Sequence, residues 1–105
     1  MQPFEIEIIQ RDDAIVLVVE GEIDIATAPL LEERLTDLEA GDAPNLIIDL
    51  DRVSFMDSTG LQVLVAHTLS ETNGRRIRLT KGSPQVQRLF AVSGMVGHLP
   101  FVSSD

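Results

Sequence analysis

The segment 45–60 constrains the fold of this chain more than any other, because a buried strand there runs directly into a capped helix. Residues 46–50 form a short apolar run interrupted only by Asp49, which is typical of a strand buried in a parallel or mixed sheet. Residues 57–60 then read Asp-Ser-Thr-Gly, and Asp57 is a favourable N-cap for a helix that begins at the next residue. We therefore predict a rigid turn between strand and helix that presents two hydroxyl groups at the surface.

The residues before this segment predict a hairpin followed by a helix. Phe4, Ile6 and Ile8 alternate with glutamates, as in a half-buried strand, and residues 14–20 form a second strand rich in β-branched side chains. Arg11-Asp12-Asp13 between them is a predicted turn, so we expect the two strands to pair antiparallel. A helix should follow Thr27 as N-cap, with Pro29 in its first turn, and should end at Gly41.

The residues after this segment predict two more helices and one or two more strands. The helix that follows Asp57 should end at Asn73-Gly74, and its apolar stripe is Leu61, Leu64, Val65 and Leu69, widened by Val63 and Ala66. Residues 76–80 are a predicted strand. Ser83 should cap a last helix with Pro84 at its first position, and its buried face is assigned to Val86, Leu89, Phe90 and either Val92 or Met95.

Residues 99–102 can add a short final strand, which gives the order β-β-α-β-α-β-α(-β). Strands that alternate with helices indicate an α/β fold, here one domain over residues 1–105 with a mixed central sheet of four to five strands and helical crossovers.

Composition narrows the classes of function. The chain has 105 residues, no cysteine and a net charge of −9, so a disulfide scaffold, a thiol nucleophile and a cysteine-bound metal are excluded. No signal peptide or membrane-spanning run is recognisable, and we expect a cytoplasmic protein without a membrane partner. Direct nucleic-acid binding is not expected, because it needs a basic excess and exposed aromatic side chains.

The charge is distributed unevenly along the chain. Residues 1–57 carry 15 acidic and 3 basic side chains, whereas residues 58–105 carry 2 acidic and 5 basic ones. Two interpretations stay open: a well-solvated acidic half that serves solubility, or an acidic face that meets a basic partner.

Catalysis finds little support in the residues. The turn at 56–60 contains one glycine and lacks the glycine-rich motifs that bind nucleotides, so no cofactor is expected. His67 and His98 are isolated in the sequence, which argues against a metal site. Ser58 lacks the first glycine of a nucleophile elbow, and His67 lies ~14 Å further along the same helix at 1.5 Å rise per residue. His98 is not excluded as a partner by the sequence, but we do not expect an enzyme.

A resemblance to a known family adds to this interpretation. Residues 53–61, Val-Ser-Phe-Met-Asp-Ser-Thr-Gly-Leu, closely resemble the signature of the anti-sigma factor antagonists, also called anti-anti-sigma factors, which are stand-alone STAS domain proteins. Two further blocks resemble the same family in the same order. They are Gly21-Glu22-Ile23-Asp24 with Thr27-Ala28-Pro29, and Ser83-Pro84 to Arg88-Leu89-Phe90 with Ser93-Gly94.

The resemblance implies a partner-switching role in bacterial transcription regulation, in stress response or sporulation signalling. The unphosphorylated protein would bind an anti-sigma factor that is also a serine kinase, and would thereby release a sigma factor. Phosphorylation of Ser58 by that kinase would switch binding off, and a serine phosphatase would reverse it; Thr59 is the second choice as acceptor. The implied partner-binding residues are Asp24, Thr27, Met56, Asp57, Ser58, Thr59, Gly60 and Gln62.

Gln62 departs from the small residue that is frequent in the family at this position, which leaves the identity of the kinase open. A phosphate would add a charge of about −1.5 to −2 at a helix N-terminus, where the fold tolerates it and an interface would not. Three alternatives remain beside this role. Asp57 and the hydroxyls can be a helix cap and nothing more; the chain can be a scaffold or sensor STAS domain of a larger assembly; or it can be a nucleotide-binding domain. We expect a monomer or weak homodimer.

Overall fold

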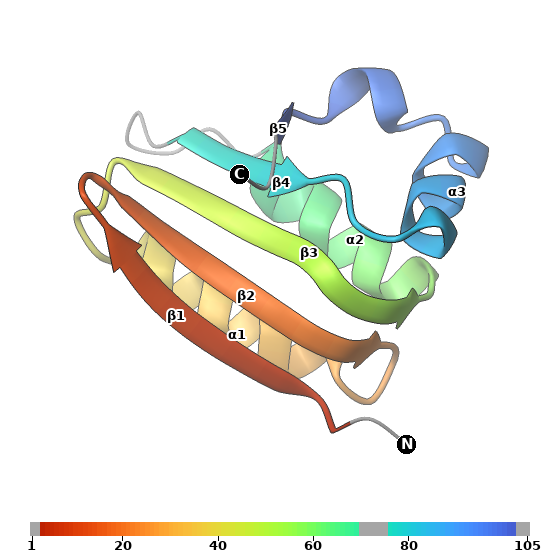
Figure 1. Ribbon diagram of the computed structural model, residues 1–105, viewed down its shortest axis with the longest axis horizontal. Coiled ribbons are helices and arrows are strands. Elements are labelled where there is room, and N and C mark those ends of the chain that lie inside the picture. Colours follow the sequence, from red (N-terminus) through yellow and green to blue (C-terminus); the bar gives the residue numbers. More distant parts are fainter. Residues whose placement is uncertain (1–2, 70–75, 103–105) are drawn as a thin grey trace.

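The computed structural model describes residues 3–69 and 76–102, and its elements follow the predicted order (Figure 1). The strands are β1 (Glu5–Arg11), β2 (Ala14–Ile23), β3 (Asn45–Met56), β4 (Arg76–Thr80) and β5 (Phe101–Val102). The helices are α1 (Ala28–Glu39), α2 (Ser58–Thr68) and α3 (Pro84–Val92), with a short 3-10 helix η1 (Val96–His98) before β5.

The five strands form one mixed sheet in the order β1-β2-β3-β4-β5. The hairpin β1–β2 is antiparallel, and each later neighbour is parallel to the one before it. Parallel neighbours need a crossover, and α1, α2 and α3 lie in those connections. The predicted mixed sheet with helical crossovers is therefore confirmed.

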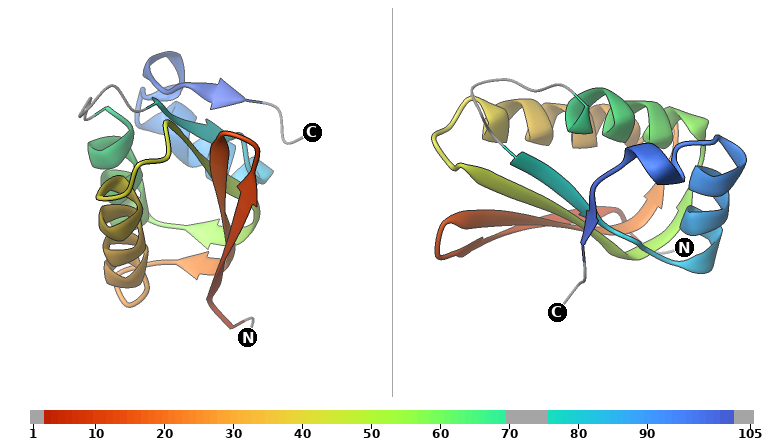
Figure 2. Two further views of the ribbon diagram at one scale, coloured as in Figure 1. Left: turned by 90° about the vertical axis from the view of Figure 1, so that its left-hand side faces the viewer. Right: turned by 90° about the horizontal axis from the view of Figure 1, so that it is seen from above.

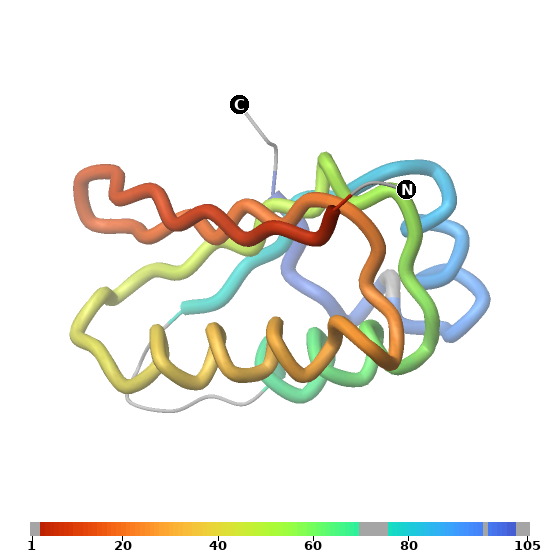
Figure 3. Tube along the Cα trace, turned by 90° about the horizontal axis from the view of Figure 1, so that it is seen from below, coloured from red at the N-terminus to blue at the C-terminus, as the bar shows by residue number. Residues whose placement is uncertain are grey.

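Two layers enclose the core. Helices α1 and α2 pack side by side against one face of the sheet, whereas α3 lies at the end of the sheet where β3 runs into α2 (Figures 2 and 3). Apolar side chains from both layers are fully buried between them, including Leu17, Val19, Leu31, Leu35, Ile48, Leu50 and Leu64. None of the helices within the described residues is both long and apolar enough to cross a bilayer.

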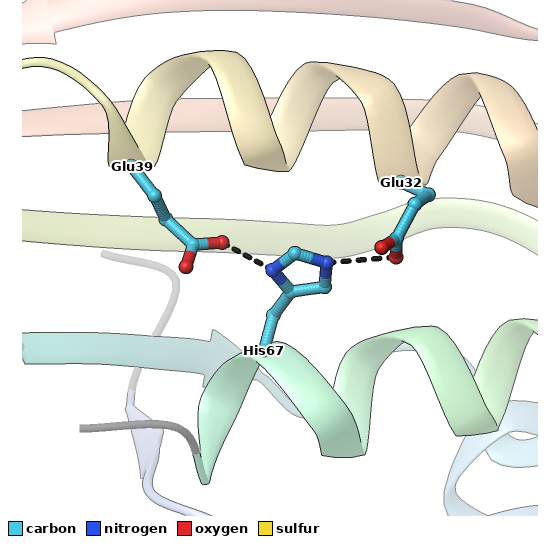
Figure 4. Close-up of polar contacts among 3 residues, drawn as sticks. All are labelled: Glu32, Glu39 and His67. Atoms are coloured by element: carbon cyan, nitrogen blue, oxygen red, sulfur yellow. Dashed lines mark hydrogen bonds and ion pairs between the residues drawn. The ribbon is translucent and has the colours of Figure 1, made fainter. Parts of the chain in front are cut away.

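A histidine connects α1 and α2, the two helices that pack against the sheet (Figure 4). His67 of α2 lies between two glutamates of α1: its Nε2 is 2.7 Å from Glu32 Oε2, and its Nδ1 forms a hydrogen bond with Glu39 Oε2. The His67 side chain is only 12% exposed. His67 is isolated in the sequence but not in the fold, because the glutamates that contact it precede it by 35 and 28 residues.

Several boundaries differ from the prediction. Strand β2 continues past residue 20 to Ile23, because β3 also continues and pairs with it up to Met56. Leu69, expected in the buried stripe of α2, is the C-cap residue and is 49% exposed. Ala66 and Val92 are also exposed, and Val86 and Phe90 supply the fully buried face of α3. The stop predicted at Asn73-Gly74 lies outside the described residues.

Candidate functional site

Two loops meet at the carboxyl ends of β2 and β3. Ile23 is paired with Met56 in the parallel ladder, and the backbone N–H of Asp57 donates to the carbonyl oxygen of Ile23 at 3.1 Å. The loop that follows β2 and the turn that follows β3 therefore leave the sheet next to each other (Figure 1). In open α/β sheets this edge, outside the carboxyl ends of parallel strands, is the usual place for a functional site.

Asp57 caps helix α2, as predicted. Its backbone is extended, and its Oδ1 accepts hydrogen bonds from the backbone N–H of Thr59 at 2.9 Å and of Gly60 at 3.2 Å. Two of the N–H groups that a helix start leaves unsatisfied are thus satisfied by one carboxylate. The cap fixes the first turn of α2, and Ser58, at the first helical position, is exposed on it.

Asp24 fixes the neighbouring loop in the same way. Its Oδ1 accepts from the backbone N–H of Ala26 at 2.9 Å and of Thr27 at 3.1 Å. The Thr27 hydroxyl donates to the carbonyl oxygen of Glu22 at 2.7 Å and accepts from the N–H of Asp24 at 2.9 Å. Thr27 is the N-cap residue of α1 by position, but its side chain holds the loop rather than the helix N–H groups.

Gly60 lets α2 approach the sheet closely. A Cβ atom at this position would lie 2.5 Å from Ile23 Cγ2 and 2.9 Å from Met56 Cγ, which is closer than nonbonded carbon atoms come. Met56 is 0% exposed, and Gly60 is buried. Both residues are thus buried in this structure rather than displayed on its surface, and their part in binding a partner stays a prediction. They set the position of the helix start.

The other predicted site residues do lie together at the surface. Ser58 and Gln62 are exposed, and the rest are partly exposed, namely Asp24, Thr27, Asp57 and Thr59. They come from the loop after β2 and from the cap and first turns of α2, and the pairing of β2 with β3 brings these two segments together.

The sequence prediction missed two apolar residues beside these polar ones. Ile25 is 76% exposed in the loop after β2, and Phe55 is 41% exposed near the end of β3. A weak signal existed for Ile25, which is flanked by the loop residues Asp24 and Ala26 rather than by a periodic pattern.

A third missed residue, Gln85, belongs to α3. Its side-chain amide bonds both backbone groups of Met56, which immediately precedes Asp57. The two residues are 29 positions apart, and no local pattern points to the contact.

The chemistry available at this site is that of a presented hydroxyl. The N-terminal end of α2 carries the positive end of the helix dipole, which favours an added negative charge at residue 58. Both ring nitrogens of His67 face glutamate oxygens at the other end of α2, so His67 is not placed to act as a base for Ser58. Among residues 3–69 and 76–102, no group of three or more histidine and acidic side chains could hold a metal ion.

Known proteins are similar to this chain in sequence and in fold. The STAS domain family matches residues 5–104. The anti-sigma-B factor antagonist of Bacillus subtilis is 36% identical over 91 residues, which cover 86% of this chain and 83% of the relative. The protein of the same name from Staphylococcus aureus is 33% identical over 91 residues, covering 86% of this chain and 84% of the relative.

Solved structures agree with these relatives. An anti-sigma factor antagonist from Mycobacterium paratuberculosis matches with a TM-score of 0.87 at 28% identity, over 98% of this chain and 87% of that protein. The anti-sigma factor antagonist SpoIIAA in its unphosphorylated form matches with a TM-score of 0.74 at 25% identity, over 97% of this chain and 90% of that protein. The family match and these relatives, together with the sheet order and the Asp57-capped helix, show that the chain belongs to the STAS domain family and, within it, to the anti-sigma factor antagonists.

Proposed function

We propose that this chain is the switchable component of a partner-switching pathway, in which phosphorylation of Ser58 ends its binding to an anti-sigma factor that is also a serine kinase. The observation that carries the proposal is the position of Ser58. It is exposed at the first residue of α2, next to a carboxylate cap that holds the turn in one conformation. A kinase can reach such a hydroxyl without unfolding the domain.

The surroundings of Ser58 support a protein partner. Ile25, in the same loop as Asp24, and Phe55, three residues before Ser58 in the sequence, have exposed apolar side chains, and exposed apolar groups are suited to anchoring a partner. Glu22 near the end of β2, Asp24 in the loop after it and the cap residue Asp57 add acidic groups at this edge of the sheet. The matching partner surface would carry apolar side chains and basic groups, because complementary charge speeds association and selects the partner.

Phosphorylation would act on the complex rather than on the fold. The phosphate would bring a charge of about −1.5 to −2, and the helix N-terminus would stabilise it by roughly 0.3–1 kcal/mol. At a closed interface the bulky phosphate would be sterically excluded and its charge would be desolvated, at a cost of several kcal/mol. About 2.7 kcal/mol already lowers affinity a hundredfold. Related folds are consistent with this, because SpoIIAA is known in unphosphorylated and phosphorylated forms, and this chain matches them with TM-scores of 0.74 and 0.68.

In this pathway the protein has no catalytic role of its own. A serine phosphatase would return phosphorylated Ser58 to the binding form, and the cytoplasm, where RNA polymerase acts, would be the site of the exchange. A monomer or weak homodimer is sufficient for such a role, since one surface binds one partner.

Phosphorylation mapping tests the proposal. The purified protein is incubated with candidate anti-sigma factor kinases and ATP, and intact mass and peptide mapping locate the phosphate. Ser58→Ala and Thr59→Val serve as matched variants, since they remove neighbouring hydroxyls of the same helical turn. We expect one phosphate on the unmodified protein and on Thr59→Val, and none on Ser58→Ala. A phosphate retained by Ser58→Ala would reject Ser58 as the acceptor.

A further inference from the structure

Strand β3 continues well beyond its parallel neighbour β4. The ladder between them ends at the pair Ile48 and Leu79, but β3 runs on to Met56. Figure 1 shows this overhang, with β4 turning away and α3 lying beside the end of β3. A strand edge without a neighbouring strand leaves backbone N–H and C=O groups that need other partners when they are shielded from water.

Two side chains stand in for the missing strand along this edge. The first is Thr80, which is 2% exposed and whose hydroxyl accepts from the N–H of Leu50 at 2.8 Å, just where β4 departs. The second is Gln85 on α3. Its Oε1 accepts from the N–H of Met56 at 2.9 Å, and its Nε2 donates to the carbonyl oxygen of Met56 at 3.0 Å. One amide side chain thus reproduces both hydrogen bonds that a neighbouring strand residue would make.

The two hydrogen bonds from Gln85 act on Met56, which lies two residues before Ser58. Met56 is bonded by Gln85, and the next residue, Asp57, is bonded by its N–H to Ile23 on the opposite side. The chain is therefore fixed from α3 and from β2 at the two residues that immediately precede Ser58. Helix α3 is itself fixed at this end, because Ser83 caps it by accepting from the N–H of Val86.

We propose that Gln85 is a positioning residue for Ser58, which sets the direction in which the turn leaves β3 and thereby the presentation of the hydroxyl to its partner. Gln85 touches neither the reacting hydroxyl nor the phosphate donor, and acts through the backbone of Met56. The effect on phosphorylation rests on the proposed function of Ser58. The effect on backbone geometry does not, so the two are tested separately.

Hydrogen exchange of the isolated protein tests the geometric part. Gln85→Ala should lower the protection of the Met56 amide by about tenfold or more, since its N–H loses its acceptor. The amide signals of residues 57–60 should shift as well. The control is Gln87→Ala, a change of the same side chain on the same helix, where the amide bonds Lys81 instead. It should leave both readouts unchanged.

Gln85→Glu gives a readout that general loss of stability does not. A protonated carboxyl group can accept from the N–H of Met56 and donate to its carbonyl, as the amide does, whereas a carboxylate can only accept. Ionisation should therefore remove the bond to the Met56 carbonyl but keep the acceptor for its N–H, so the amide signals of residues 57–60 in Gln85→Glu should shift as pH rises from about 4 to about 7, across the ordinary titration range of glutamate. Gln87→Glu should show no such shift relative to the unmodified protein.

The outcomes separate the two proposals. Unchanged Met56 protection and unchanged signals of residues 57–60 in a folded Gln85→Ala variant would overturn the positioning role, as would a flat pH profile of these signals in Gln85→Glu. If these readouts move as expected, initial rates with the kinase that modifies Ser58 should fall about tenfold in Gln85→Ala and stay within about twofold in Gln87→Ala. Failure of every kinase to modify the unmodified protein would reject the proposed function and leave the exchange result standing.

Discussion

Replacement of Gly60 by alanine should destabilise this domain although it places a better helix former in a helix. The added Cβ would lie 2.5 Å from Ile23 Cγ2 and 2.9 Å from Met56 Cγ. Both contacted side chains are 0% exposed, so neither has free space into which it can move. The start of α2 must then shift away from the sheet, and the shift falls on the turn that carries Ser58.

The size of the effect follows from two opposing terms. Overpacking of a well-packed core costs ~1–3 kcal/mol. Alanine regains up to ~1 kcal/mol over glycine in helix propensity. The net loss in the free energy of unfolding should be about 1–2 kcal/mol, which lowers the melting temperature of a domain of this size by about 5–15 °C.

Circular dichroism during urea and thermal unfolding measures this loss, since the chain has no tryptophan for fluorescence. Gly97→Ala is the matched control, because a Cβ there would meet no atom within 4 Å, and it should change stability by no more than about 0.5 kcal/mol. In an Ile23→Ala background the clash partner is removed, so the cost of Gly60→Ala should shrink. A Gly60→Ala protein as stable as the unmodified one, or an equal cost in both backgrounds, would refute the steric reasoning.

Two further predictions concern the Asp57 cap and the histidine clip, by which we mean the contacts of His67 with Glu32 and Glu39. Asp57→Ala should lower the free energy of unfolding by about 1–2 kcal/mol, whereas Asp57→Asn, which keeps an acceptor for the first-turn N–H groups, should cost under about 0.5 kcal/mol. Urea unfolding compares them, and equal losses would show that the side-chain acceptor is unimportant. His67→Ala should cost about 1–2 kcal/mol, chiefly through Glu39, since Glu32 is 50% exposed and a surface contact contributes little. His98→Ala, a change of an exposed histidine, is its control, and equal melting temperatures of the two variants would contradict the clip.

Local signals in the sequence predicted much of the fold. The Asp57 cap, the Ser83 cap with Pro84 after it and the β1–β2 hairpin depend on residues close together in the chain, and all three are present. The parallel orientation of the later strands could then be inferred, because helical crossovers join parallel strands, whereas the order of the strands in the sheet was not predicted.

Gly21 misled the prediction of where β2 ends. A glycine after a β-branched run resembles a strand terminator, but here it lies inside the strand at φ +102°, next to a register shift against β3. A Cβ on it would lie 2.8 Å from the carbonyl oxygen of Pro3. Glycine at this position allows the backbone near Pro3 to pack closely against β2. The sequence alone does not distinguish a glycine with this role from one that ends a strand in a turn.

The parts of the site that could not be predicted depend on contacts between distant residues. The bonds of Gln85 to Met56 and of His67 to two glutamates appear only when helices and strands are placed in three dimensions. The exposure of Ile25 and Phe55 follows from the same packing, since neither residue lies in a periodic apolar pattern that would assign it to the core or to the surface.

The affinity of the anti-sigma factor for this protein, before and after stoichiometric phosphorylation of Ser58, tests the central proposal most directly. Calorimetry should show a loss of at least about a hundredfold on phosphorylation. Ser58→Ala should bind like the unphosphorylated protein and be insensitive to kinase treatment, and Ser58→Glu should bind weakly. Equal affinities of the phosphorylated and unphosphorylated forms would contradict the account, because the added charge at the start of α2 would then have no effect on the interface.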